Sequence, residues 1–178
     1  SFKDITIIEI GKVTPFKRTS IYNYFHTKEE IFLLLLQKEY EIWIEDLEKI
    51  IAENKKLTKE NFADLIAKSL ENRLQLLKLL SMNLFDMEMN SRQENLIEFK
   101  KVYGKSLATV KKCLDKFFPK MSEESKNNFL YAFFPFVYGI YPYTVVNEKQ
   151  ISAMKAANTN FIFHSVYELT FNFVEKFL

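Results

Sequence analysis

The chain has 178 residues, 48% of them hydrophobic, and a net charge of +2. Three glycines and four prolines leave little turn material for an all-β protein, so we expect an all-α fold. Its length fits one compact unit or two small units that share a core, and its single cysteine, Cys113, excludes an internal disulfide and fits a reducing cytoplasm.

Residues 6–28 predict two short helices joined by a tight turn. Thr6 and Glu9 form a capping box, in which each side chain bonds to the backbone of the other residue. Pro15 interrupts the first helix because it has no amide hydrogen to donate. A second helix is expected over 17–24. Two short helices around a turn, the second polar and basic, are typical of a helix-turn-helix.

The charge of this segment is one-sided. From residue 10 to residue 28 there is no acid, and four residues are basic: Lys12, Lys17, Arg18 and Lys28. A local positive face on a nearly neutral chain suits a DNA phosphate backbone. The alternative is an ordinary solvated helix face.

The same segment resembles the DNA-binding domain of TetR-type (tetracycline-repressor-like) bacterial regulators. The residues that carry the resemblance are Thr6-x-x-x-Ile10-Gly11 and Ile21-Tyr22-Asn23-Tyr24-Phe25-x-x-Lys28-Glu29-Glu30-Ile31. The Tyr-x-Tyr-Phe-x-x-Lys-Glu portion matches the family pattern intact, whereas the turn over 14–17 departs from it.

The resemblance implies a domain division. It places an incomplete helix-turn-helix DNA-binding domain over 1–48 and a helical effector-binding and dimerisation domain over 49–178. Since the family has one more helix before this point, we expect the first helix of the DNA-binding domain to be missing from the chain.

Nine residues are candidates for contacts with a double-stranded DNA operator. Those that would face the major groove are Lys17, Arg18, Thr19, Ser20 and Asn23. Arg18 can pair with guanine and Asn23 with adenine. The residues better placed to contact phosphates are Thr6, Tyr22, Tyr24 and Lys28. For the tyrosines and the lysine, the resemblance implies the same role. For Tyr22 and Tyr24 the alternative is ordinary packing.

Helices are expected along the rest of the chain. Thr27 and Glu30 form a second capping box that opens a helix to about residue 54, and Thr58 caps a helix that runs to residue 80. Ser91 and Glu94 form a third box for a helix to about 118. Further helices are expected after Ser122, from Asn147 to about 157, and over 161–178.

The run 129–146 contains no charged residue and is long enough for a membrane span. Pro135, Gly139 and Pro142 interrupt it, so we expect a buried helix without membrane contact. The last segment carries two apolar stripes, and one helix cannot hide both inside a small monomer. With the dimerisation that the resemblance implies, the candidate homodimer interface is Phe129, Phe133, Phe136, Ile162, Val166, Leu169, Phe173 and Phe177.

A small-molecule effector site is a further expectation from the resemblance. Methionine is adaptable, and aromatic rings favour a lipophilic, aromatic or cationic ligand. The candidate lining residues are Met82, Phe85, Met89, Tyr103, Phe133, Phe134, Tyr138, Tyr141 and Tyr143. For each of them the alternative is ordinary core packing.

No enzyme activity, cofactor or metal is expected. The chain lacks a nucleophile motif and a Gly-rich phosphate loop, and His26 and His164 form no metal-ligand motif with the cysteine. We expect a cytoplasmic, ligand-responsive transcriptional regulator, a homodimeric repressor released from a palindromic operator by its effector. The alternative is the same fold acting through a protein partner docked on the C-terminal domain, without a small-molecule effector.

Overall fold

A computed structural model describes residues 4–15, 18–82 and 84–178. This part of the chain is all-α, as predicted, and forms no strand. Its helices are α1 (Ile7–Val13), α2 (Arg18–Tyr24), α3 (Lys28–Glu53), α4 (Lys59–Glu71), α5 (Leu74–Ser81), α6 (Leu84–Met89), α7 (Gln93–Phe117), α8 (Glu123–Gly139), α9 (Tyr141–Thr144), α10 (Glu148–Ala156) and α11 (Val166–Phe177).

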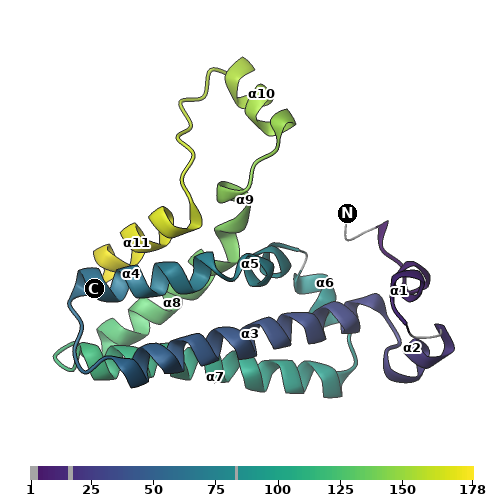
Figure 1. Ribbon diagram of the computed structural model, residues 1–178, viewed down its shortest axis with the longest axis horizontal. Helices are drawn as coiled ribbons and strands as arrows, with labels where there is room; N and C mark the ends of the chain where they lie inside the picture. Colours follow the sequence, from purple (N-terminus) through teal and green to yellow (C-terminus); the bar gives the residue numbers. More distant parts are fainter. Residues whose placement is uncertain (1–3, 16–17, 83) are drawn as a thin grey trace.

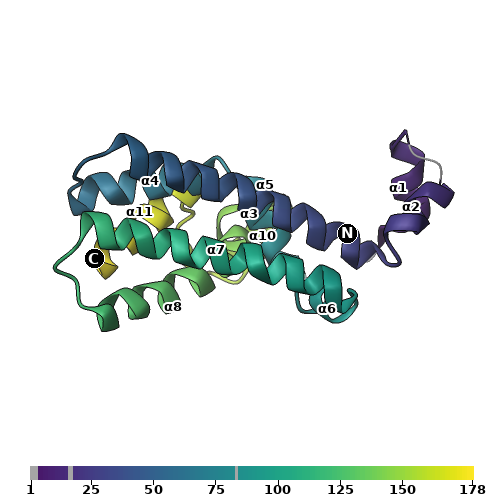
Figure 2. The same ribbon diagram turned by 90° about the horizontal axis from the view of Figure 1, so that it is seen from below.

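The long helices α3 and α7 lie side by side along the molecule, and α4, α5, α8 and α11 pack around them (Figures 1 and 2). We call this bundle the body. Helices α1 and α2, the head, lie beyond the first turn of α3, at one end of the body (Figure 1). Helix α10 stands away from the body, between α9 and the segment that returns to α11 (Figure 1).

Side-chain caps fix several of the predicted helix starts. At each of these positions the side-chain oxygen accepts a hydrogen bond from the amide three residues later. The caps are Thr6, Thr27, Thr58, Ser122 and Asn147. Full capping boxes form at Thr6 and Asn147. At Thr27 the predicted box is half-formed, because the Glu30 carboxylate accepts from the His26 amide instead of the Thr27 amide.

The helix expected over 58–80 is in fact two helices. Helix α4 ends at Glu71, and α5 begins at Leu74 after Arg73 leaves helical geometry, with φ −119° and ψ 43°. The Arg73 side chain turns to α3, where its Nε lies 2.8 Å from Asp46 Oδ2. The break therefore comes with a tertiary ion pair that periodicity alone does not reveal.

Two other predicted starts were wrong. Ser91 does not cap α7, because its hydroxyl donates to the Met87 carbonyl and the helix begins after Arg92. The last helix begins at Val166 rather than at 161, because Ser165 and Glu168 form a capping box there. The charge-free run divides into α8 and α9, and none of the helices in the described ranges has the length and apolar character to cross a membrane.

Helix α3 supplies the centre of the core. Tyr40, Trp43 and Leu47 are fully buried on its inner side. The Trp43 indole donates to Ser69 Oγ at 3.1 Å and lies beside the ring of Phe133. A buried indole with its N–H satisfied keeps its apolar contacts without the cost of an unpaired donor.

Replacement of Phe62 tests the core directly. Its fully buried ring contacts the rings of Phe117 and Phe118. We expect Phe62→Ala to lower the free energy of unfolding by about 3–5 kcal/mol, because it leaves a cavity. The exposed Ile97 is the control, and Ile97→Ala should cost less than about 1 kcal/mol. Urea unfolding followed by Trp43 fluorescence measures both, and equal losses would contradict this core.

Candidate nucleic-acid interface and effector site

The head presents a polar surface on α2. Among the described side chains of these two helices, Ile7 of α1 and Ile21 of α2 are buried, and the helices pack against each other. Tyr22, Asn23 and Tyr24 are exposed on α2. A small helix pair with an exposed polar second helix has the shape that enters a DNA major groove.

The other predicted DNA contacts are placed as follows. Ser20 and Lys28 are half-buried. The Thr6 hydroxyl is engaged with Glu9 in the capping box of α1. Lys17 lies outside the described residues, and so do the side chains of Arg18 and Thr19, although their backbone belongs to α2.

An ion pair between the buried Glu30 and the partly exposed Arg92 joins the head to the body. Glu30, in the first turn of α3, is 1% exposed, and its Oε1 lies 2.7 Å from Arg92 Nε. Oε2 lies 3.1 Å from Arg92 Nη2 and accepts from the His26 amide at 2.8 Å. Arg92 Nη2 also donates to the Tyr24 carbonyl at 2.8 Å. The body residue Arg92 therefore reaches both the end of α2 and the start of α3.

The surroundings of Glu30 keep it ionised. Burial alone would raise the pKa of the carboxyl. The hydrogen bonds from the Arg92 side chain and from the His26 and Arg92 amides outweigh that effect and lower the pKa from 4.5 to about 2. The sequence gives no signal for this pair, because 62 positions separate its members.

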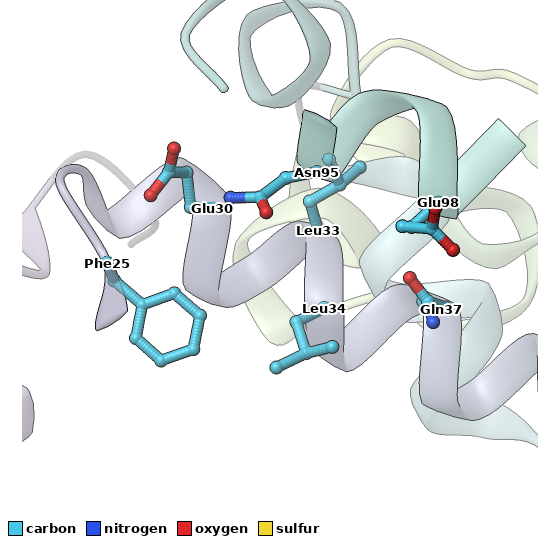
Figure 3. Close-up of a pocket in the computed structure, with 7 residues that line it drawn as sticks. All are labelled: Phe25, Glu30, Leu33, Leu34, Gln37, Asn95 and Glu98. Carbon is cyan, nitrogen blue, oxygen red and sulfur yellow. The ribbon is translucent and has the colours of Figure 1, made fainter. Parts of the chain in front are cut away.

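A pocket of about 230 Å³ lies beside this ion pair. Figure 3 shows that its walls come from α3, from α7 and from the turn before α3. Its lining residues are Phe25, Glu30, Leu33, Leu34, Gln37, Asn95 and Glu98. The pocket marks the junction of head and body.

A second candidate site lies in the body between α7 and α8. This groove has a volume of about 470 Å³ and is mostly apolar, with an amide and two phenols. Its lining residues are Tyr103, Leu107, Asn127, Leu130, Tyr131, Phe134 and Pro135. Ligand sites are commonly apolar concavities of about 300–1,000 Å³ with a few polar groups.

Tyr103 connects this groove to two further tyrosines, Tyr40 and Tyr138. The Tyr40 ring packs edge-on against Tyr103, with the centroids 5.9 Å apart. The buried Tyr40 hydroxyl makes no hydrogen bond of ordinary length with a described residue. Burial, with a smaller effect of the neighbouring Tyr138, raises the pKa of Tyr40, and burial raises the pKa of Tyr138 to about 12. All three phenols are therefore neutral donors at pH 7.

The structure brings together only part of the predicted effector set. Phe133 and Phe134 are buried in the core. The half-buried members packed against that core are Met82, Tyr103, Tyr138 and Tyr141. Those exposed on α6 and α9 are Phe85, Met89 and Tyr143. Sequence reasoning missed Tyr40, Asn127 and Tyr131, although the spacing of the last two puts them on one face of α8.

The predicted dimer residues also divide by burial. Phe129, Phe133 and Val166 are buried in the chain's own core, where a second copy cannot contact them without opening the protomer. The remaining ones reach the surface: Phe136, Ile162, Leu169, Phe173 and Phe177. The Phe173 ring stacks on both Phe136 and Phe177, each with centroids 4.3 Å apart.

Comparison with known families decides the assignment. The model of the family described as "Tetracyclin repressor-like, C-terminal domain" matches residues 37–170, from the middle of α3 into α11. The chain belongs to the TetR family. The TetR-like body thus carries the match, and the head precedes it. No curated protein matches the chain. Membership of the TetR family indicates a transcriptional regulator.

Glu30→Gln tests the charge of the Glu30–Arg92 ion pair. Because the folded pKa of Glu30 is lowered, its ionised form stabilises the TetR fold above about pH 4.5, and this contribution is lost as the pH falls toward 2. At pH 7 we expect the variant to be less stable by roughly 1–3 kcal/mol, the value of hydrogen bonds to a charged group.

Urea unfolding of wild type and variant at several pH values measures this difference. The gap between them should close between about pH 4.5 and pH 2. Glu98→Gln in the same pocket is the matched control, because the Glu98 side chain is exposed and pairs with the exposed Lys101. A gap that stays constant over this pH range would contradict the assigned charge.

Proposed function

We propose that this TetR-family protein is a homodimeric repressor that binds a palindromic operator through α2 and leaves it when a small effector binds the body. The observation that carries the proposal is the polar, exposed α2 on a head beyond the end of a TetR-like body. A C2 dimer would present two such heads to two half-sites.

The DNA contacts divide into two kinds. Arg18 and Asn23, with Lys17, Thr19 and Ser20, would read base edges in the major groove. Phosphate contacts from Tyr22, Tyr24 and Lys28, with Thr6, would supply affinity and its salt dependence. The acid-free sequence from residue 10 to residue 28 supports this division, because no carboxylate there repels the backbone.

The α7–α8 groove is the proposed effector site. Its size and apolar lining suit a small lipophilic or aromatic molecule, and Asn127 and Tyr131 would fix its polar groups. The neutral phenols of Tyr103 and Tyr138 add hydrogen-bonding capacity. This open volume favours an effector over the alternative in which a protein partner docks on a filled body.

The proposed dimer face combines α8 and α11. The stacked rings of Phe136, Phe173 and Phe177 cross from one helix to the other. An apolar groove lies beside them and includes Ile140 and Leu169. Aromatic surface of this kind is costly to leave in water and is enriched at subunit interfaces.

Arg18→Ala tests the base-reading role of α2. We expect a loss of about 1–3 kcal/mol in operator binding and relaxed preference at one or two operator positions, because a bidentate contact to guanine is removed. Fluorescence anisotropy with the operator and single-base variants measures both effects. Lys28→Ala is the control and should weaken binding to all sequences while lowering the salt slope by about 1. Equal loss on every sequence would instead make Arg18 a phosphate contact.

Phe177→Asp tests the dimer face. This side chain is 48% exposed, so the protomer should stay folded while a carboxylate is placed in the proposed interface. We expect the dimer dissociation constant to rise tenfold or more, which corresponds to about 1.4 kcal/mol, because a charge would be desolvated. Analytical ultracentrifugation measures it, with Ile97→Asp on α7 as the control. A wild-type monomer or an unchanged dimer would refute this face.

A further inference from the structure

The C-terminal end of α2 is bonded by a residue from another part of the chain. The last carbonyls of a helix lack partners within the helix, and a cation nearby is favourable. Residues 21–24, the last turn of α2, contain no basic side chain. Arg92, 68 positions away, donates from Nη2 to the carbonyl of Tyr24 at 2.8 Å.

The position of the Arg92 guanidinium is fixed by Glu30. The two side chains meet at two points, Nε to Oε1 at 2.7 Å and Nη2 to Oε2 at 3.1 Å. The Arg92 amide donates to the same Oε1 at 3.1 Å. The Glu30 carboxylate also accepts a hydrogen bond from the His26 amide. A planar guanidinium that makes two parallel contacts with a carboxylate has a defined orientation, which an ammonium group would not have.

A second bond ties the same two parts together. The hydroxyl of Thr27, the N-cap of α3, donates to the Asn90 carbonyl at 3.0 Å. The turn between α6 and α7 is therefore bonded both to the end of α2 and to the start of α3. A shift of that turn must move α2 or break these bonds.

We propose that Arg92 is a positioning residue, which sets the angle of α2 relative to the body through Glu30 and the Tyr24 carbonyl. This inference rests on the proposed DNA-binding role of α2. Although the Arg92 side chain is 40% exposed, three of its hydrogen bonds go to Glu30 and Tyr24. Its proposed role is therefore to hold α2 in place, and the salt dependence of binding tests the competing role of a direct phosphate contact.

Arg92→Lys tests the proposal, since it keeps the positive charge and removes the guanidinium that contacts both Glu30 oxygens. Arg73→Lys is the matched control, because Arg73 makes a comparable 2.8 Å contact with Asp46 of α3 within the body. We expect R92K to bind the operator roughly tenfold more weakly, the effect of one charge-assisted hydrogen bond, with an unchanged salt slope. R73K should bind as wild type does. Unchanged affinity of R92K would overturn the inference. A salt slope reduced by about 1 in R92Q, which lacks the charge, would mark a phosphate contact and would overturn it as well.

Two further readouts separate this inference from the proposed function. Amide hydrogen exchange of α1 and α2 should be faster in R92K than in wild type and R73K, whether or not DNA binds, and unchanged exchange overturns the inference. The double variant E30Q/R92K should lose no more operator affinity than either single variant, because the two residues act as a unit. Additive losses count against it. If R92K does not fold, E30Q/R92Q takes its place, because it leaves no unpaired buried carboxylate. Failure of the wild type to bind any DNA would refute the proposed function alone.

Discussion

Helix α3 belongs to two parts of the molecule at once, and the ion pair of the buried Glu30 with the partly exposed Arg92 lies where those parts meet. Along the body, Tyr40, Trp43 and Leu47 anchor α3 in a close-packed core that resists bending. At its first turn, Glu30 is bonded to the guanidinium that also contacts the end of α2. The ion pair and the Thr27–Asn90 hydrogen bond therefore link the orientation of the head to the rigid body.

The same helix α7 carries Arg92 at its start and Tyr103 in the proposed effector groove. Eleven residues separate them, which is roughly 16 Å along a helix. An effector can shift the head only by binding one arrangement of α7 and α8 better than another. A change at Tyr103 would be carried by α7 to the turn that holds α2. This gives the proposed release of DNA a continuous physical route.

Local signals predicted much of this fold from the sequence. The caps at Thr6, Thr58 and Ser122 and the periodic stripe of α3 depend on neighbouring residues, which a sequence displays directly. The capping box at Ser165 was equally visible but was overlooked in favour of a longer apolar stripe. The break at Arg73 and the pairing of Glu30 with Arg92 depend on residues distant in sequence, so local reasoning assigned Glu30 to a capping box. Sequence reasoning did not place Asn127 at the α7–α8 groove, or Tyr40 beside it, for the same reason. The groove forms only when helices distant in sequence pack together.

Selection of binding sites from random DNA duplexes by the full-length protein tests the central claim most directly. The account predicts enrichment of a two-fold symmetric sequence, with half-site centres about one helical turn or a multiple of it apart, because two α2 helices of a C2 dimer would read it. Enrichment of a single unpaired half-site would contradict the dimer. No enrichment at all would contradict the DNA-binding role of α2.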